Sequence, residues 1–172
     1  FTLKPFQTGP DDTIALQYTG GTTGVSKGAM LTNRNIVANM LQIKAWLSPV
    51  LQEREVIALC PLPLYHIFAF TVNCLAFMSC GGCNILIVNA RDLPALIKEW
   101  RTHKPNIVTG VNTLFNGLLN HPDFSSLDFS SLKASVGGGM AVQRAVAERW
   151  QQVTGCSLTE GYGMTESSPV LT

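Results

Sequence analysis

Short apolar runs alternate along this chain with longer stretches of helical character, and this alternation limits the fold more than any other feature. Strands are expected at residues 13–18, 55–60, 84–88, 106–109, 133–136 and 157–160, and helices at residues 34–46, 66–78, 93–103, 113–119 and 141–153. A strand that is followed by a helix of about ten to fifteen residues usually returns to the same sheet in the same direction. The chain is therefore predicted to have an α/β fold, with a layered, mostly parallel sheet and crossover helices.

Capping residues and prolines mark where two of these helices begin or end. Asn33 is predicted to cap the helix at residues 34–46, which is expected to end near Pro49. Asp92 is predicted to cap the helix at residues 93–103. Each of these signals places a turn next to an expected strand.

The composition excludes several classes of protein. Of the 172 residues, 46% are hydrophobic and 13% are charged, which is the opposite of a disordered chain. The 12 basic and 11 acidic residues leave a net charge of +1 and are spread along the chain, so no nucleic-acid partner is expected. The longest apolar run, from Ile67 to Cys80, contains Asn73 and is too short to span a membrane.

The first residue and the number of cysteines indicate the cellular compartment of the protein. The chain opens at Phe1 without a basic and then apolar leader, so no signal peptide is expected. Five cysteines are an odd number for a disulfide framework, and a chain of this length does not need one. We therefore expect a cytoplasmic protein, and we expect both ends to be cuts within a longer chain.

Glycine-rich turns follow three of the expected strands. They are Gly20-Gly21, Gly137-Gly138-Gly139 and Gly161-Tyr162-Gly163. In parallel α/β sheets, ligands bind where the strands end and the loops gather. The three turns are therefore predicted to form one binding site, although the triple glycine is equally well explained as a plain tight turn.

The segment YTGGTTGVSKGA, residues 18–29, has the composition of a phosphate-binding loop. Its glycines allow backbone N–H groups to converge on an anion, its hydroxyl groups add donors, and Lys27 adds a positive charge. It does not match the GxxxxGK[ST] loop, because Val25 stands five residues after Gly20 and Gly28 follows the lysine. A flexible surface loop is the alternative interpretation.

The segment GYGMTES, residues 161–167, offers a second set of groups for a nucleotide. Glu166 is a hard oxygen ligand of the kind that Mg²⁺ accepts together with phosphate oxygens. Thr165 can donate its hydroxyl to a phosphate, and Tyr162 offers a flat ring to a purine. The alternative is a solvated loop carboxylate beside a core tyrosine.

His66 and the Cys80-Gly81-Gly82-Cys83 motif allow more than one interpretation. A lone histidine beside an apolar helix is usually a capping or core residue, but it can also line a site. The two cysteines have no second cysteine pair for a zinc site, and they close a helix where a redox motif would open one. Both cysteines are therefore predicted to pack in the core.

Residues 18–29 resemble the phosphate-binding signature of the adenylate-forming superfamily, and residues 161–167 resemble its second signature, GYGxTE. The segments MLTNRN, residues 30–35, and PLPLYHIF, residues 61–68, are most similar to the long-chain fatty-acid-CoA ligases. The similarity covers essentially the whole chain. It implies that residues 1–172 are a single fragment of the large N-terminal lobe, without the mobile C-terminal lobe.

The resemblance also implies the ligands and the residues that bind them. ATP, Mg²⁺, coenzyme A and a fatty acid are the expected partners. Lys27, Thr165, Glu166 and His66 are the expected catalytic residues, with Glu166 as the metal ligand. The expected nucleotide-binding residues are Tyr18, Thr19, Gly20, Gly21, Thr22, Thr23, Gly24, Val25, Ser26, Lys27, Gly28, Ala29, Gly137, Gly138, Gly139, Gly161, Tyr162, Gly163 and Thr165.

Two other functions are weighed against fatty-acid activation. An amino-acid or aryl adenylation domain of the same superfamily is one, but an amino-acid substrate calls for an acidic residue, and residues 65–69 (YHIFA) contain none. A nucleotide-binding fragment without turnover is the other, since the resemblance places a catalytic lysine in the missing lobe. We expect the isolated piece to be inactive, and we expect the parent enzyme to form a homodimer and to associate with the inner face of the membrane.

Overall fold

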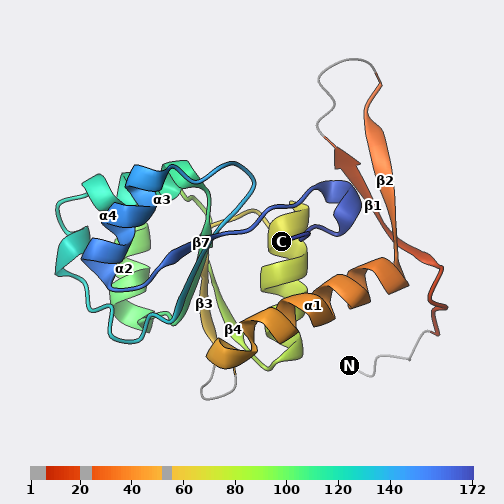
Figure 1. Cartoon of the computed structure of the whole chain (residues 1–172), viewed down its shortest axis with the longest axis horizontal. Coiled ribbons are helices and arrows are strands. Elements are labelled where there is room, and N and C mark those ends of the chain that lie inside the picture. Colours follow the sequence, from red (N-terminus) through yellow and green to blue (C-terminus); the bar gives the residue numbers. More distant parts are fainter. Residues whose placement is uncertain (1–6, 20–24, 52–55) are drawn as a thin grey trace.

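The computed structural model of the chain describes residues 7–19, 25–51 and 56–172 (Figure 1). Within these ranges, five strands form one sheet in the order β4-β3-β5-β6-β7, and every neighbouring pair is parallel. The five strands are β3 (Ile57–Cys60), β4 (Cys83–Leu86), β5 (Ile107–Gly110), β6 (Ala134–Gly137) and β7 (Leu158–Glu160). The predicted α/β fold with a mostly parallel sheet is therefore confirmed.

Helices cover both faces of this sheet. One face carries α2 (Leu93–His103), α3 (Asn112–Asn120) and α4 (Arg144–Thr154), and the other carries α1 (Asn33–Leu51) and the π-helix η1 (Ala69–Phe77) (Figure 1). Successive side chains of a strand point to opposite faces. Accordingly, Leu59 and Val108 are buried against α2, α3 and α4, whereas Ala58 and Ile107 are buried against α1 and η1. No helix in the described ranges is both long enough and apolar enough to cross a membrane.

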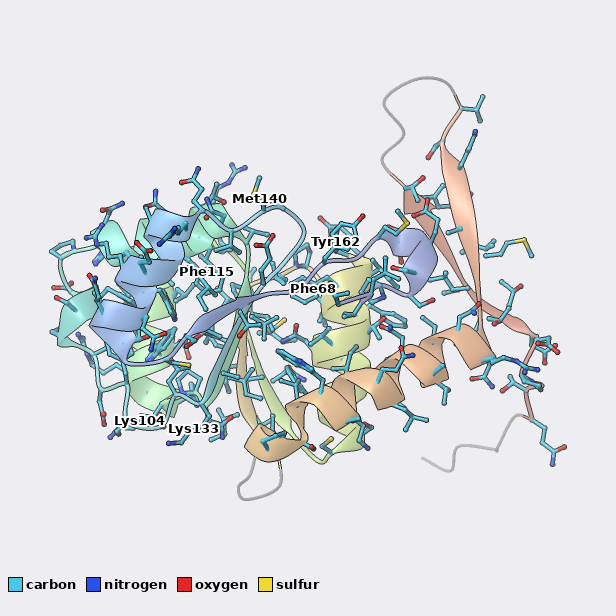
Figure 2. The ribbon with its side chains drawn as sticks, viewed as in Figure 1. Phe68, Lys104, Phe115, Lys133, Met140 and Tyr162 are labelled. Carbon is cyan, nitrogen blue, oxygen red and sulfur yellow. The ribbon has the colours of Figure 1, made fainter. Side chains whose placement is uncertain are left out.

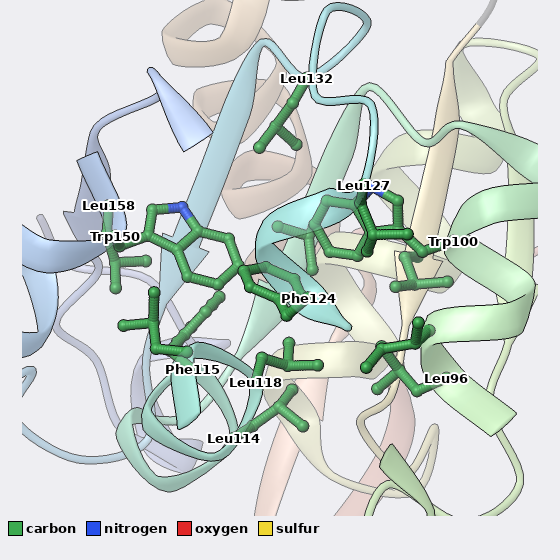
Figure 3. Close-up of a cluster of buried hydrophobic side chains, with 14 of the residues drawn as sticks. Leu96, Trp100, Leu114, Phe115, Leu118, Phe124, Leu127, Leu132, Trp150 and Leu158 are labelled. Atoms are coloured by element: carbon green, nitrogen blue, oxygen red, sulfur yellow. The ribbon is translucent and has the colours of Figure 1, made fainter. Parts of the chain in front are cut away.

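Aromatic side chains fill the core between the sheet and the helices α2, α3 and α4 (Figure 3). The rings of Phe115 and Trp150 meet edge to face, with their centroids 4.8 Å apart. Trp100 contacts Trp150 in a similar geometry at 6.2 Å. The indole Nε1 of Trp150 donates a 3.0 Å hydrogen bond to Ser135 Oγ, so α4 is held to β6 by a polar contact as well as by packing.

The first two strands form a separate antiparallel hairpin. β1 (Thr13–Thr19) confirms the predicted strand, but it pairs with β2 (Lys27–Thr32) and not with the parallel sheet. No strand was predicted at β2, because residues 18–29 were interpreted as one glycine-rich phosphate-binding loop, and Lys27 and Gly28 also have low strand propensity. The pairing overrides this preference. The Tyr18 ring lies over Gly28, and a Cβ atom at the glycine would stand 3.7 Å from Tyr18 Cε1.

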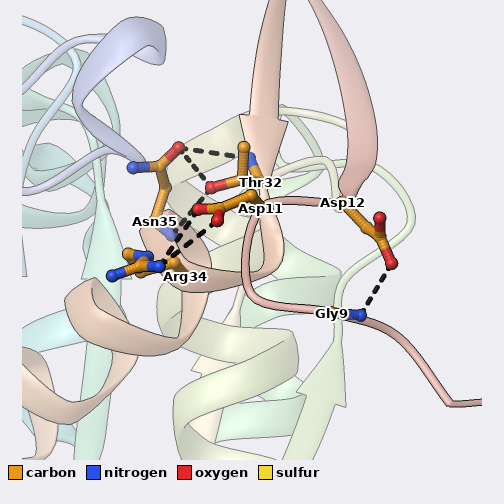
Figure 4. A network of polar contacts seen from close by, with 6 residues as sticks. All are labelled: Gly9, Asp11, Asp12, Thr32, Arg34 and Asn35. Carbon is orange, nitrogen blue, oxygen red and sulfur yellow. Dashed lines mark hydrogen bonds and ion pairs between the residues drawn. The ribbon is translucent and has the colours of Figure 1, made fainter.

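Helix α1 begins one residue earlier than predicted and ends later. Thr32 is the capping residue, because its Oγ1 accepts a 3.3 Å bond from the Asn35 N–H while Asn35 Oδ1 accepts a 3.2 Å bond from the Thr32 N–H (Figure 4). Asn33 is the first helical residue, so its prediction as the cap is wrong. The helix also continues past Pro49 to Leu51, since a proline within the last turn removes only one hydrogen bond.

The other helices agree more closely with the prediction. Asp92 caps α2, because its Oδ1 accepts a 3.0 Å hydrogen bond from the Ala95 N–H. The apolar helix expected at residues 66–78 is present, but nine of its residues form the π-helix η1. The short 3₁₀ turns η2 (Phe124–Ser126) and η3 (Thr165–Ser167) were not predicted.

The structure corrects the prediction for the paired cysteines. Cys80 and Cys83 are both exposed, on the turn that joins η1 to the edge strand β4, so core packing was wrong for them. The glycine after Cys80 has φ +73°, so the chain makes a tight turn here, and both cysteines lie on its exposed side. Cys60, by contrast, is buried in β3, and its burial raises the pKa of the thiol to about 11.

We expect thiol alkylation to separate these cysteines. At pH 8 the exposed thiols of Cys80 and Cys83 should react with iodoacetamide, whereas Cys60 should stay unmodified, because it is both buried and protonated. Peptide mass spectrometry after a short reaction measures the extent of alkylation at each cysteine. Modification of Cys60 at the rate of the other two, in protein that is still folded, would contradict the assignment.

Candidate functional site

The carboxyl ends of the parallel strands gather the predicted site residues at one edge of the sheet. Figure 2 shows Met140 and Tyr162, which follow β6 and β7, at the edge opposite Lys104 and Lys133, which precede β5 and β6. Ligands bind at this edge in open α/β sheets. The turns that follow β6 and β7 therefore lie at the same edge of the sheet.

A cavity of about 1040 Å³ lies between this edge, helix α1 and the last twelve residues of the chain. Nine of the residues predicted for the site line it. They are Thr19, His66, Gly138, Gly139, Gly161, Tyr162, Gly163, Thr165 and Glu166. The structure thus brings together parts of all three glycine-containing segments and the predicted histidine.

The remaining predicted residues lie elsewhere. Gly137 is buried at the end of β6 and does not line the cavity. Tyr18 and residues 25–29 belong to the hairpin or to its approach, outside the cavity wall. Gly20, Gly21, Thr22, Thr23 and Gly24 lie outside the described residues.

Lys27 lies on the hairpin, outside the cavity wall. It pairs with Thr19 across the two strands, and Thr19 Oγ1 donates a 3.2 Å hydrogen bond to the Lys27 carbonyl. The strand that Lys27 begins contacts η3, the turn that carries Thr165 and Glu166. In Figure 1 the hairpin stands beside this turn. The lysine-bearing hairpin and the acidic turn are therefore on the same side of the molecule.

The triple glycine is more than a tight turn. Gly137 is the last residue of β6, and its carbonyl accepts a 2.7 Å hydrogen bond from the Gly161 N–H. Gly138 lies against Phe68, and a Cβ atom there would stand 3.0 Å from Phe68 Cε1. Gly139 has φ +76°, a conformation that side chains disfavour. The small residues thus let the chain pass closely between β7 and the helix that follows β3.

The GYGMTES segment folds back on itself and presents Glu166 near its tip. The Tyr162 N–H donates to the Thr172 carbonyl at 2.8 Å, and the Met164 N–H donates to the Pro169 carbonyl at 3.1 Å. Gly163 forms an antiparallel bridge with Val170. We call residues 162–172 the acidic loop. Its internal bonds shape the turn η3, in which Glu166 is exposed.

The acidic loop needs a glycine at position 163. A Cβ atom there would overlap the Pro169 carbonyl oxygen and would stand 2.8 Å from the carbonyl carbon, which is closer than any side chain can approach backbone. Gly161, two residues earlier, has more room, since the nearest atoms to a Cβ would be 3.8 Å away. The two glycines of this motif therefore have different structural roles.

His66 combines the two roles that its sequence context left open. Its Nδ1 accepts a 3.3 Å hydrogen bond from the Phe68 N–H at the start of the helix that contains η1, so it acts as a capping residue. Its imidazole is also exposed and lines the cavity. The histidine can therefore face a ligand while its backbone position is fixed.

One whole wall of the cavity, the face of α1, was not predicted from the sequence. The lining residues on this helix recur at intervals of three and four positions: Arg34, Asn35, Ala38, Asn39, Gln42, Ile43, Trp46 and Leu47. This spacing is that of a single helical face, so helical periodicity could have identified the wall. Nothing in the local sequence indicates that the opposite side of the cavity is the acidic loop.

The carboxylates of the site fit Mg²⁺ when a nucleotide supplies the other ligands. Glu166 forms no ion pair or hydrogen bond with any described residue, and Glu160 lines the same cavity. Among the described residues, no three His, Cys, Asp or Glu side chains are close enough together to hold a metal ion by themselves. Mg²⁺ is commonly held by one or two carboxylates together with phosphate oxygens and water.

Comparison with known proteins identifies the family to which this chain belongs. The profile of the AMP-binding enzymes matches residues 2–172. The chain belongs to the AMP-binding enzyme family. Among solved structures, it resembles the anthranilate CoA ligase AuaEII in complex with anthranoyl-AMP, with a TM-score of 0.82 and 27% identity over 98% of this chain and 32% of that one. It also resembles apo MatB from Rhodopseudomonas palustris, with a TM-score of 0.83 and 26% identity.

Curated relatives carry the name long-chain-fatty-acid–CoA ligase. The protein from Yersinia pestis is 57% identical over 161 residues, which are 94% of this chain and 29% of the relative. The protein from Bacillus subtilis is 39% identical over 159 residues, which are 92% of this chain and 28% of the relative. This AMP-binding chain therefore spans less than a third of the length of the relatives it matches.

Substitution of Gly163 tests the geometry of the acidic loop. We expect Gly163→Ala to force the loop apart and to lower the free energy of unfolding by about 1–3 kcal/mol, because the new methyl group overlaps backbone atoms of Pro169. Gly161→Ala is the matched control, since it places a methyl group in ordinary contact distance. Urea denaturation of both variants measures the difference. Equal stability of the two variants would refute this account of the loop.

Proposed function

We propose that this chain is part of a long-chain fatty-acid–CoA ligase. In the first half-reaction, the fatty-acid carboxylate attacks the α-phosphorus of ATP, pyrophosphate leaves and an acyl-adenylate forms. In the second, the thiol of coenzyme A attacks the acyl carbon, AMP leaves and the thiol proton is released. The observation that carries the proposal is the single cavity shared by Thr19, Gly138, Tyr162 and Glu166, in a chain so similar to proteins of that name.

The nucleotide is proposed to lie along the edge of the sheet. Tyr162 is exposed and lines the cavity, so its ring is available to stack on adenine. Gly138 and Gly161 allow the base to approach the backbone. Thr165 lines the cavity and is proposed to donate its hydroxyl to the α-phosphate. Lys27 and the rest of residues 18–29 would bind the β- and γ-phosphates from the hairpin.

Glu166 is proposed to hold Mg²⁺ against the phosphates of ATP. A bound Mg²⁺ would neutralise phosphate charge as pyrophosphate leaves. The carboxylate of Glu166 is exposed to the cavity and is not neutralised by any described cation, so its full charge is available to the metal. Charge stabilisation of this kind is usually the largest contribution to catalysis.

The fatty acid is proposed to enter the apolar part of the same cavity. Ile43, Leu47, Val72 and Val136 line this part, and none of them carries a charge. His66 lies on the cavity wall and is proposed to stand near the carboxylate, without acting as a general base. A fatty acid is already ionised at neutral pH, so the reaction needs alignment and charge neutralisation more than proton removal.

The proposal extends to where and how the parent enzyme works. Coenzyme A is proposed as the second substrate, and association with the inner face of the membrane is proposed because the acyl substrate is apolar. Exposed apolar side chains, such as Leu16 and Met30 on the hairpin and Val88 after β4, support contacts with another surface or a second copy.

The acid-dependent exchange of pyrophosphate into ATP tests the proposed activity. In the full-length protein that carries this chain, palmitate should support exchange, and a panel of amino acids and aryl acids should not, because the cavity offers an apolar wall and residues 65–69 contain no carboxylate. Exchange that depends on an amino acid alone would reject the assignment. The 172-residue chain by itself is expected to give none.

Removing the charge of Glu166 tests its role in the first half-reaction. We expect Glu166→Gln to lower the exchange rate by about 10²-fold or more and to leave the melting temperature unchanged, because the side chain is exposed and pairs with no residue that the structure describes. Glu148→Gln is the control, since it removes an exposed carboxylate of α4 that pairs only with Arg144. A Glu166→Gln enzyme with the control's activity would contradict the proposed role.

A further inference from the structure

Two buried polar side chains fasten the acidic loop to the body of the molecule. They are Asn39, which is 4% exposed on α1, and Thr71, which is 0% exposed on η1. In the described part of the chain, no other residue outside the loop forms a hydrogen bond with residues 162–172. The internal bonds of the loop fix its shape, and these two side chains act on its place together with the packing of Val170 and the contact between β2 and η3.

Asn39 pairs with the backbone of Val170 as a neighbouring strand would. Its Nδ2 donates a 2.7 Å hydrogen bond to the Val170 carbonyl, and its Oδ1 accepts a 3.1 Å bond from the Val170 N–H. The second Nδ2 hydrogen is directed to Gln42 Oε1, at 3.2 Å. Although Asn39 lines the cavity, both of its donors are used within the protein. Its function is therefore to hold the loop and not to bind a ligand.

Thr71 holds the loop at Ser168, the residue directly after η3. Its Oγ1 donates a 2.9 Å hydrogen bond to the carbonyl of Ser168, which is buried and lies two residues after Glu166. Ser168 has φ +78°, a conformation that persists only where the surrounding structure enforces it. The Thr71 bond and the 3.2 Å bond from the Ser168 N–H to the Thr165 carbonyl supply such enforcement.

We propose that Asn39 and Thr71 are positioning residues for Thr165 and Glu166. This inference rests on the proposed function, in which these two side chains meet the phosphates and the metal. Among the described residues Glu166 has no ion-pair or hydrogen-bond partner to orient it, so the direction of its carboxylate depends on the backbone of η3. That backbone is anchored at Ser168 and Val170, by side chains from two different helices. Mutation of a residue that orients a metal ligand typically lowers metal affinity or activity by about 10–100-fold.

The π-helix also supplies a matched control. Thr109 of β5 is 0% exposed, and its Oγ1 donates a 3.1 Å hydrogen bond to Asn73 Oδ1, two residues after Thr71 on η1. Thr109→Val and Thr71→Val each remove one buried hydroxyl and keep the branched shape. Only Thr71→Val removes a bond to the acidic loop, so the comparison separates positioning from general loss of stability.

The experiment uses the full-length protein that carries this chain. It measures hydrogen exchange of the acidic loop and the Mg²⁺ dependence of pyrophosphate exchange separately. Hydrogen exchange without ligand should be faster at residues 163–170 in Thr71→Val than in Thr109→Val. The Mg²⁺ concentration for half-maximal pyrophosphate exchange should rise about tenfold in Thr71→Val, stay at the wild-type value in Thr109→Val, and return towards it in Thr71→Ser, which restores the hydroxyl.

Asn39→Leu provides an independent variant should Thr71→Val fold poorly. It removes both bonds to Val170, and we expect it to raise the same Mg²⁺ concentration by about tenfold or more. Unchanged hydrogen exchange and metal dependence in Thr71→Val or in Asn39→Leu would overturn the positioning role. A wild-type enzyme without fatty-acid-dependent pyrophosphate exchange would instead overturn the proposed function, whatever the exchange at residues 163–170.

Discussion

The parallel register of the central strands is the constraint on which the rest of the structure depends. Gly110, Gly137 and Glu160 are paired in register on β5, β6 and β7, so the segments that follow these strands begin at one level. The Gly138 N–H continues the pairing to the Gly110 carbonyl, and the Gly161 N–H continues it to the Gly137 carbonyl. The glycine-containing turns therefore emerge side by side, and the cavity forms where they meet helix α1.

In the site, the exposed groups that face the cavity are distinct from the buried groups that bond to the loop backbone. Tyr162, Thr165 and Glu166 face the cavity from a loop whose own backbone bonds determine its shape. Asn39 and Thr71 are buried, with their polar atoms directed to the backbone of that loop. An exposed carboxylate can thus keep its charge for a metal ion, because burial and pairing are assigned to other residues.

Local patterns predicted much of this protein, and they were wrong where distant contacts override them. Strand periodicity and the Asp92 cap were readable because each depends on neighbours in sequence. The strand β2 was missed because its pairing with β1 compensates for Lys27 and Gly28. Core packing was predicted for Cys80 and Cys83 because a zinc site and a redox motif were excluded, but the turn between η1 and the edge strand β4 exposes both.

The sequence by itself determined the α/β class, the two signatures and the residue types that suit a nucleotide, since these are properties of short segments. Only the tertiary structure decided which residues share a cavity and which hold the acidic loop. Asn39 and Val170 are 131 positions apart, and Thr71 and Ser168 are 97 apart. No local pattern records such pairs, because hydrogen bonds between them exist only after the sheet has brought α1, η1 and the strand ends together.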